Sequence, residues 1–134
     1  AAGTGCFPTT DARIWATDTS ASAVRLARAN VCRHGVGDRV SIVHGDLLDG
    51  SPAGLDLVVA NLPYVAVGLQ ADRPELAEEP PEAVFAAGDG LGPYRRLVQA
   101  CESALQPDGL LAIQFHGQVV GTHASELSAL KLAA

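Results

Sequence analysis

The chain has 134 residues, of which 48% are hydrophobic, and its formal net charge is −6. These values predict one globular domain rather than a disordered segment. No apolar run approaches the roughly 20 residues that a membrane-spanning helix requires, and no secretory signal is recognisable. The nine Lys and Arg residues are spread thinly, so a nucleic-acid partner is not expected. We expect a cytoplasmic protein.

The cysteines and histidines show no metal-binding pattern. Cys6, Cys32 and Cys101 are odd in number, far apart and without a Cys-x-x-Cys pair, which argues against a disulfide framework and a zinc site. We expect each thiol to be a small buried hydrophobic group. The four histidines share no ligand spacing either, so no metal site is predicted.

The first half of the chain predicts a strand, a helix and a second strand. Residues 13–17 form a short apolar strand that ends at Asp18. Ser20 is a suitable N-cap for the helix that follows, and Gly35 is a suitable stop signal. The second strand, 40–43, is followed by a turn at Asp46.

The second half predicts two further strands around a long loop and a helix. Residues 56–60 are a nearly continuous apolar run after Asp56, as expected of a strand covered on both faces. Residues 66–92 are rich in Pro, Glu and Gly and predict a long, partly helical loop, which in a compact domain usually has a function. The remaining elements are a helix from Pro93 to Leu105, a turn at 107–109, a strand at 110–115 and a weakly helical tail at 119–134.

This order of elements predicts an α/β fold with a mostly parallel sheet and helices on both of its faces. In such sheets, ligands bind beyond the carboxyl ends of the strands. Asp18, Asp46 and Asn61 each follow the end of a predicted strand. We therefore expect these three residues to line one binding edge.

Three short segments suit a nucleotide-like cofactor. Gly3-Thr4-Gly5 would let the backbone approach the ligand closely, although an ordinary turn is the alternative. Asp18 could accept both ribose hydroxyls, or serve as a favourable charge before the helix. Asp46 could accept a hydrogen bond from an exocyclic amine while Leu47 packs on a purine face, or Asp46 could be a simple turn residue.

The tetrapeptide Asn61-Leu62-Pro63-Tyr64 is the most specific feature. Methylation of a planar NH₂ group needs two oxygen acceptors that hold both hydrogens and aim the nitrogen lone pair. The Asn61 side-chain oxygen and the Leu62 carbonyl could supply them, Pro63 would stiffen the backbone, and Tyr64 could stack on the substrate. Catalysis would then depend on orientation and exclusion of water. A proline-containing turn after a strand is the alternative.

These motifs resemble the bacterial release-factor glutamine methyltransferases of the HemK type, over roughly residues 1–118. The loop Gly88-Asp89-Gly90-Leu91, together with Glu79-Pro80, distinguishes this family from other methyltransferases with a similar tetrapeptide. The matching segments are 11–18, 23–30, 38–40, 45–48, 56–65, 79–80 and 88–91.

The resemblance implies a Rossmann-like class I methyltransferase that uses S-adenosylmethionine. The substrate would be the side-chain amide of the glutamine in the Gly-Gly-Gln motif of a peptide chain release factor, which places the protein in translation termination. Asn61, Leu62, Pro63 and Tyr64 would take the amide. The cofactor would be lined by Gly3, Thr4, Gly5, Asp18, Asp46, Leu47 and Asn61.

The chain also departs from the family pattern. Leu62 replaces the more usual proline, as in rRNA adenine methyltransferases, and Gln114 stands where the family has Glu. Only seven residues separate Gly5 from Arg13, too few for a crossover of about a dozen residues. We expect one partial catalytic domain over 1–134, incomplete at both ends and without the family's N-terminal substrate-binding domain. An rRNA adenine N6-methyltransferase, or a non-catalytic remnant that binds a partner, are the alternatives.

Overall fold

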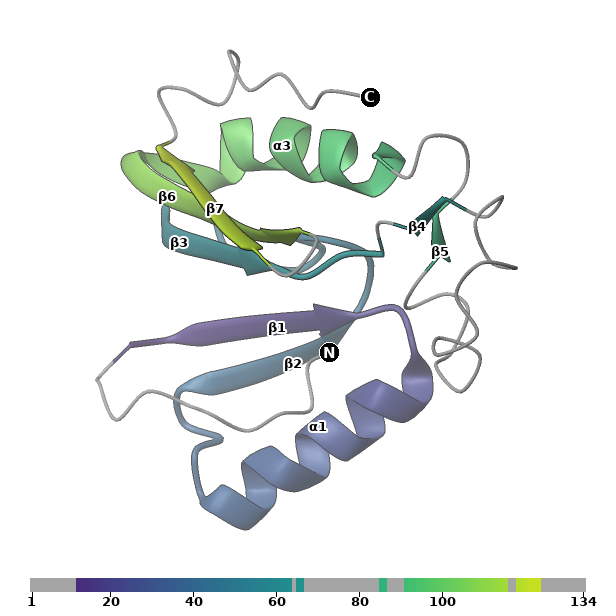
Figure 1. Cartoon of the computed structure of the whole chain (residues 1–134). Helices are drawn as coiled ribbons and strands as arrows, with labels where there is room; N and C mark the ends of the chain where they lie inside the picture. Colours follow the sequence, from purple (N-terminus) through teal and green to yellow (C-terminus); the bar gives the residue numbers. More distant parts are fainter. Residues whose placement is uncertain (1–11, 64, 67–84, 87–90, 116–117, 124–134) are drawn as a thin grey trace. The chain divides into compact units, whose positions relative to one another are not determined.

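The computed structural model describes residues 12–63, 65–66, 85–86, 91–115 and 118–123. The chain forms two compact units, Ala1–Ser51 and Pro52–Ala134, and each is described by itself. The described strands pair into three small sheets, β1-β2, β3-β6-β7 and β4-β5 (Figure 1). The architecture of the described residues is therefore α/β, with parallel strand pairs and two helices.

The first unit is a strand, a helix and a parallel strand. β1 (Ile14–Asp18) pairs with β2 (Val40–His44), in a register that runs from Ile14 opposite Val40 to Asp18 opposite His44. The helix α1 (Ala21–His34) connects them and covers one face of the pair (Figure 1). The strands and the helix predicted between residues 13 and 43 are confirmed.

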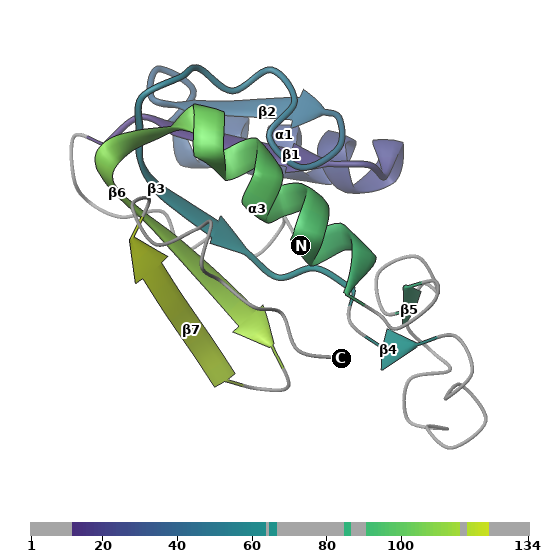
Figure 2. The same ribbon diagram turned by 90° about the horizontal axis from the view of Figure 1, so that it is seen from above.

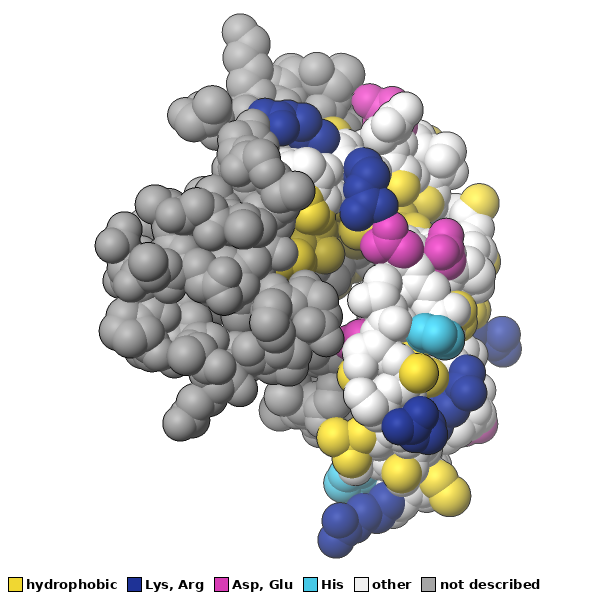
Figure 3. All heavy atoms as spheres, turned by 90° about the vertical axis from the view of Figure 1, so that its right-hand side faces the viewer, with side chains coloured by type: hydrophobic (Ala, Val, Ile, Leu, Met, Phe, Trp, Pro, Cys, Tyr) yellow, Lys and Arg dark blue, Asp and Glu magenta, His cyan; other side chains and the backbone are white. Residues whose placement is uncertain are grey.

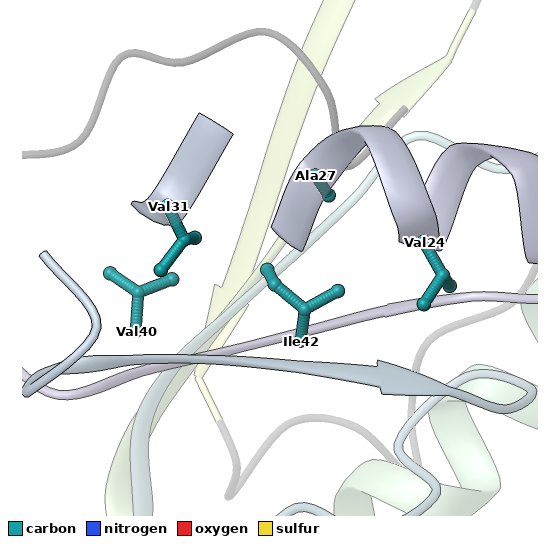
Figure 4. Close-up of a cluster of buried hydrophobic side chains, with 5 residues drawn as sticks. All are labelled: Val24, Ala27, Val31, Val40 and Ile42. Carbon is teal, nitrogen blue, oxygen red and sulfur yellow. The ribbon is translucent and has the colours of Figure 1, made fainter. Parts of the chain in front are cut away.

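The core of this unit forms where the apolar face of α1 packs against the apolar face of β2. Val24, Ala27 and Val31 recur at helical spacing on α1, whereas Val40 and Ile42 alternate along β2. Figure 4 shows the three helical side chains directed at the two strand side chains, and all five residues are buried. Fully burying a Val or Ile side chain contributes roughly 1.5–3 kcal/mol, so this contact is the main support of the unit.

Both ends of α1 have the predicted caps. Ser20 has an extended backbone, and its hydroxyl oxygen accepts a hydrogen bond from the Ala23 N–H at 3.4 Å. Gly35 ends the helix with φ of 62°, and its N–H donates to the Cys32 carbonyl at 3.1 Å. A positive φ costs glycine little, because glycine lacks a Cβ. His34 is the last helical residue.

The main part of the second unit that the structure describes is a three-stranded sheet with one helix. β3 (Leu55–Ala60) is parallel to β6 (Leu105–Phe115), and β6 is antiparallel to β7 (Gln118–His123). Figure 2 shows β6 and β7 running side by side in opposite directions. The helix α3 (Gly92–Ala104) begins with Pro93 in its first turn, as predicted. The short strands β4 (Val65–Ala66) and β5 (Phe85–Ala86) form a separate parallel pair.

Only one face of this sheet is buried among the described residues. The buried residues of the sheet and of α3 are Val58, Leu111, Ile113, Tyr94, Leu97 and Cys101. On β3 the neighbours of Val58 point the other way, and Leu57 is 51% and Val59 74% exposed. The prediction that strand 56–60 is covered on both faces is therefore wrong for the described structure, because α3 covers a single face and successive side chains alternate.

Two predicted boundaries near the end of the chain are also wrong. β6 starts at Leu105, directly after α3, so Leu105 belongs to the strand and the turn expected at 107–109 is an irregularity within it. Gly109 is needed there, because a Cβ would lie 2.9 Å from the Leu55 carbonyl oxygen. Residues 119–123 were expected to be weakly helical, but they form most of β7. They pair with the edge of β6, and Val119, Val120 and Thr122 favour strands.

Other predictions concern residues or arrangements that the structure does not describe. The helical part of the 66–92 loop and the tail 124–134 lie outside the described residues. A single sheet with helices on both faces, and a single domain over 1–134, stay predictions because the two units are described separately. The helices that the structure describes include none long and apolar enough to span a bilayer.

The cysteines divide between the two helices. Cys101 on α3 is completely buried, as predicted, and burial raises the pKa of its thiol from 9.0 to about 11. Cys32 on α1 is exposed, so the expectation that it is buried is wrong. The physical reason is its position next to Val31, because adjacent helical residues point in different directions. Cys6 lies outside the described residues.

Candidate active site

The predicted cofactor residues of the first unit meet at the carboxyl end of the β1-β2 pair. The parallel register places Asp18 opposite His44, so the loops after both strands begin at the same edge. The Gly45 N–H donates to the Asp18 carbonyl at 3.2 Å, and the Thr17 hydroxyl donates to the Leu47 carbonyl. The structure therefore brings together the segments that contain Asp18, Asp46 and Leu47.

The Asp18 side chain has a local partner. Its Oδ1 atom accepts a hydrogen bond from the Ser20 N–H at 2.8 Å, just before α1 begins. The alternative role at the start of the helix is thus present in the structure. A carboxylate has two oxygens and about four acceptor positions, so this contact is compatible with ribose binding through Oδ2. The cofactor role of Asp18 stays a prediction.

The loop after β2 has a tightly fixed backbone. The Asp46 N–H donates to Asp49 Oδ2, and the Asp49 N–H donates to the Asp46 carbonyl, both at 2.9 Å. A Cβ at Gly45 would lie 2.7 Å from the Asp49 Cβ, so only glycine fits there. Leu47 has a φ of 49°, which is uncommon for a residue with a side chain. The Thr17 contact holds the Leu47 carbonyl in this conformation, as expected of a segment with an imposed geometry.

The predicted acceptor residues of the second unit directly follow β3. Asn61 is exposed, whereas Leu62 and Pro63 are half-buried. The Leu62 carbonyl accepts a hydrogen bond from the Tyr94 hydroxyl at 2.8 Å. Tyr64, like Gly3, Thr4 and Gly5, lies outside the described residues.

Tyr94 is the residue that sequence reasoning did not assign to the site. In the sequence it is one member of the apolar stripe of its helix, and in the structure it is 1% exposed. Its hydroxyl lies 2.8 Å from the Leu62 carbonyl oxygen and 3.1 Å from the Gln114 carbonyl oxygen. A buried tyrosine needs a partner for its hydroxyl, and this requirement was the signal available in the sequence.

Side chains of both charges lie on the face that Figure 3 draws. Figure 3 shows Lys and Arg side chains in separate groups on one face, with uncharged and acidic side chains between them. The candidate residues of the first unit offer carboxylates after β1 and β2, and those of the second unit offer carbonyl oxygens after β3. Such groups suit the hydroxyls and amino group of a nucleoside and the hydrogens of an NH₂ group. Within the described ranges, no cluster of three or more His, Cys, Asp or Glu could hold a metal ion.

Comparison with known proteins identifies several similar methyltransferases, although no protein-family model matches the chain. The chain is 37% identical to the release factor glutamine methyltransferase of Deinococcus radiodurans, over 87% of this chain and 41% of that protein. It is 31% identical to the ribosomal protein uL3 glutamine methyltransferase of Burkholderia pseudomallei, over 92% of this chain and 45% of that protein.

A third relative methylates a different compound. The 4-amino-L-phenylalanine/4-methylamino-L-phenylalanine methyltransferase of Streptomyces pristinaespiralis is 39% identical over 79% of this chain and 36% of that protein. The chain thus spans less than half the length of each of these relatives. The residues after β3 and the similarity along most of the chain agree, and the chain belongs to the family of HemK-type glutamine methyltransferases.

Proposed function

We propose that this chain provides the methyl-transfer site of an S-adenosylmethionine-dependent methyltransferase whose acceptor is the side-chain amide of a protein glutamine. The observation that carries the proposal is the pair of oxygen acceptors at the carboxyl end of β3. The exposed Asn61 directly precedes Leu62, whose carbonyl accepts a hydrogen bond from the buried Tyr94 hydroxyl at 2.8 Å.

The chemistry of an amide nitrogen explains why acceptors suit this reaction. The nitrogen lone pair is delocalised into the carbonyl group, so a strong base is of little use while both hydrogens remain unoriented. The Asn61 oxygen and the Leu62 carbonyl would each accept one N–H, and would so hold the amide with its out-of-plane lone pair aimed at the methyl group; the amide proton that is lost on transfer would pass to solvent. Orientation of this kind can contribute about 7–11 kcal/mol to lowering a barrier.

The first unit would hold the cofactor, which supplies an activated methyl group when it is bound. Asp18 Oδ2 would accept a ribose hydroxyl, and Asp46 would accept from the adenine amine. The imposed conformation of Leu47 would place its side chain against the purine ring. The glycines of Gly3-Thr4-Gly5 would approach the ligand through their backbone.

Two protein substrates are supported by relatives. The proteins from D. radiodurans and B. pseudomallei are named for a release factor and for ribosomal protein uL3 respectively. We propose a release factor with its Gly-Gly-Gln motif, on the evidence of the Gly88–Leu91 loop in the sequence. The relative that acts on 4-amino-L-phenylalanine supports the wider class of planar nitrogen acceptors.

The test is incubation of the chain with methyl-labelled S-adenosylmethionine and each candidate substrate. We expect label on the Gly-Gly-Gln glutamine of the release factor, located by mass spectrometry of the peptides. A release factor with Gln replaced by Glu at that position is the control, because it lacks the acceptor nitrogen. Label on uL3 alone would show that uL3, and not the release factor, is the substrate. No label on either protein would contradict methyl transfer to glutamine by this chain.

The two alternatives are decided by separate measurements. An rRNA adenine methyltransferase is suggested only by Leu62 and is opposed by the charge of −6. It would be favoured by retention on an RNA column that fades as salt rises. A non-catalytic remnant would be favoured if the chain unfolds cooperatively but calorimetry detects no binding of S-adenosylmethionine.

A further inference from the structure

The first turn of α3 and the ends of two parallel strands meet at one buried hydroxyl group. β3 and β6 are parallel, with Ala60 opposite Ile113, so the residues that follow both positions lie at the same edge. Tyr94 stands in the first turn of α3, and its hydroxyl reaches the Leu62 carbonyl at 2.8 Å and the Gln114 carbonyl at 3.1 Å. These contacts link segments 32 and 20 residues away from Tyr94 in the sequence.

The hydroxyl has one hydrogen for two acceptors. A phenolic O–H donates a single strong hydrogen bond, so the shorter contact to Leu62 takes most of the donation while Gln114 competes for it. The Tyr94 side chain is 1% exposed, and water therefore cannot replace the hydroxyl easily. The Leu62 carbonyl has two lone pairs, so one remains for a second donor.

We infer that Tyr94 is a positioning residue, which fixes the direction of the Leu62 carbonyl so that its second lone pair faces the acceptor nitrogen. This inference rests on the proposed function. Pro63 makes the contact more important, because the Leu62-Pro63 peptide bond has no N–H that could anchor the following backbone. Among the described residues, the Tyr94 hydroxyl thus anchors this peptide plane from outside the loop.

The test is Tyr94→Phe, which removes the hydroxyl and keeps the ring in the core. Leu62-Pro63 is the only Leu-Pro pair in the sequence. In a chain labelled with ¹³C at leucine carbonyls and ¹⁵N at proline, a carbon–nitrogen correlation spectrum therefore contains one signal, which reports on the Leu62 carbonyl. We expect this signal to move upfield in the variant, as the carbonyl loses its donor.

The second measurement is the rate of methyl transfer. We expect kcat to fall roughly 10- to 100-fold with KM for the acceptor protein changed less than threefold, since misplacement of about 1 Å costs up to about 100-fold in rate. Ser103→Ala is the matched control. It also removes a hydroxyl that donates to a backbone carbonyl of α3, that of Ala100 at 3.2 Å, and it should change neither the carbonyl signal nor kcat.

Cys101→Ala separates positioning from simple loss of stability. It opens the same helical core, where Cys101 is fully buried, without touching the Tyr94 hydroxyl. We expect a lower denaturation midpoint with an unchanged Leu62 signal and unchanged kcat at temperatures where the chain is folded. A further measurement uses the unmutated chain. We expect its proton spectrum to contain a separate, slowly exchanging resonance from the Tyr94 hydroxyl.

The outcomes distinguish this inference from the proposed function. An unmoved Leu62 signal in Tyr94→Phe would overturn the inference, whatever the activity. A moved signal with unchanged kcat would overturn the positioning role. A wild-type chain that transfers no methyl group would overturn the proposed function and the role of Tyr94 in it, while the carbonyl signal still reports whether the contact exists.

Discussion

The carboxyl ends of the β1-β2 and β3-β6 strand pairs are stabilised in different ways. After β1 and β2, polar side chains bond to backbone groups of the same two loops, either a few residues away, as Asp18 does with Ser20 and Asp49 with Asp46, or in the neighbouring loop, as Thr17 does with Leu47. After β3 and β6, the main polar contact comes from Tyr94, a buried residue of a helix. The first edge can form from its own loops, whereas the second depends on the packing of α3.

This difference explains which changes should affect folding and which should affect chemistry. At the first edge, one side chain can serve both a turn and a ligand, so the two roles must be separated by conservative variants. At the second edge, Asn61 is exposed, so we expect removal of its side chain to lower the rate of methyl transfer without lowering the free energy of unfolding. The predictions below test this contrast.

The largest effect is expected in the core of the second unit. Leu111 is completely buried on β6, so Leu111→Ala should lower the free energy of unfolding by about 2–5 kcal/mol, measured by urea denaturation. Leu57→Ala is the matched control in the same sheet, because Leu57 is 51% exposed. It should cost less than about 1 kcal/mol. Equal costs would show that both faces of the sheet are covered.

The two described thiols should differ strongly in reactivity. Cys32 on α1 is exposed, whereas Cys101 on α3 is buried and its pKa is raised to about 11. A rise of two units lowers the thiolate fraction about 100-fold below pH 9, and burial blocks the reagent as well. Iodoacetamide followed by peptide mass spectrometry should label Cys32 at least about 100-fold faster. Similar rates would mean that the core beside α3 opens readily.

Because the pKa of the Cys101 thiol is raised in the folded chain, we expect a loss of stability at high pH. The unfolded chain ionises Cys101 near its ordinary pKa of 9.0, whereas the folded chain does so near 11. Its contribution is therefore complete below pH 9 and is lost as pH rises from 9 to 11. Cys101→Ala should reduce this part of the pH dependence, which urea denaturation at several pH values would measure. If the pH dependence of the free energy of unfolding is unchanged in the variant, it arises from other groups.

Removal of the Asn61 side chain should affect the rate without affecting the fold. Asn61→Ala deletes one of the two proposed acceptors, and we expect methyl transfer to fall about 100-fold, comparable to the loss of one donor from an oxyanion hole. Asp56→Ala is the control at the other end of β3, where Asp56 accepts a hydrogen bond from Gln106 at 2.7 Å. A comparable loss of rate in the control would remove the case for Asn61.

At the first edge, Asp18→Asn should separate the two roles of this residue. The amide oxygen can still accept from the Ser20 N–H, so the free energy of unfolding should change by less than about 0.5 kcal/mol. Loss of the charge should weaken S-adenosylmethionine binding about tenfold by calorimetry. Asp18→Ala should lose both functions. Unchanged cofactor affinity in both variants would leave Asp18 with its structural role alone.

The smallest effect is expected at the N-terminus of α1. Ser20→Ala removes the acceptor of the Ala23 N–H and should cost about 0.5–1 kcal/mol in urea denaturation. The same substitution at Ser103 of α3 should be nearly neutral, because that hydroxyl is exposed and bonds within its own helix. A neutral Ser20→Ala would show that the Asp18 contact alone begins the helix.

Local chemistry was predictable from the sequence. The strands near 14–18 and 40–44, the caps at Ser20 and Gly35, and the position of Asn61 after β3 follow from apolar periodicity and from the conformations that single residues prefer. Similarity to methyltransferases supports the family predicted from the tetrapeptide. These features depend on neighbours within a few residues, so the order of residues is enough to specify them.

Tertiary structure decided the features that need distant partners. Val119, Val120 and Thr122 favour strands, but a strand also needs a pairing partner, and residues 118–123 form one because the edge of β6 is available. Cys32 and Cys101 have the same chemistry, and only the packing of each helix decides which is exposed. Tyr94 reads as one more apolar helical residue until the fold places its hydroxyl between two carbonyl groups. A hydrogen bond across 32 residues depends on the path of the chain, which local residue preferences do not fix.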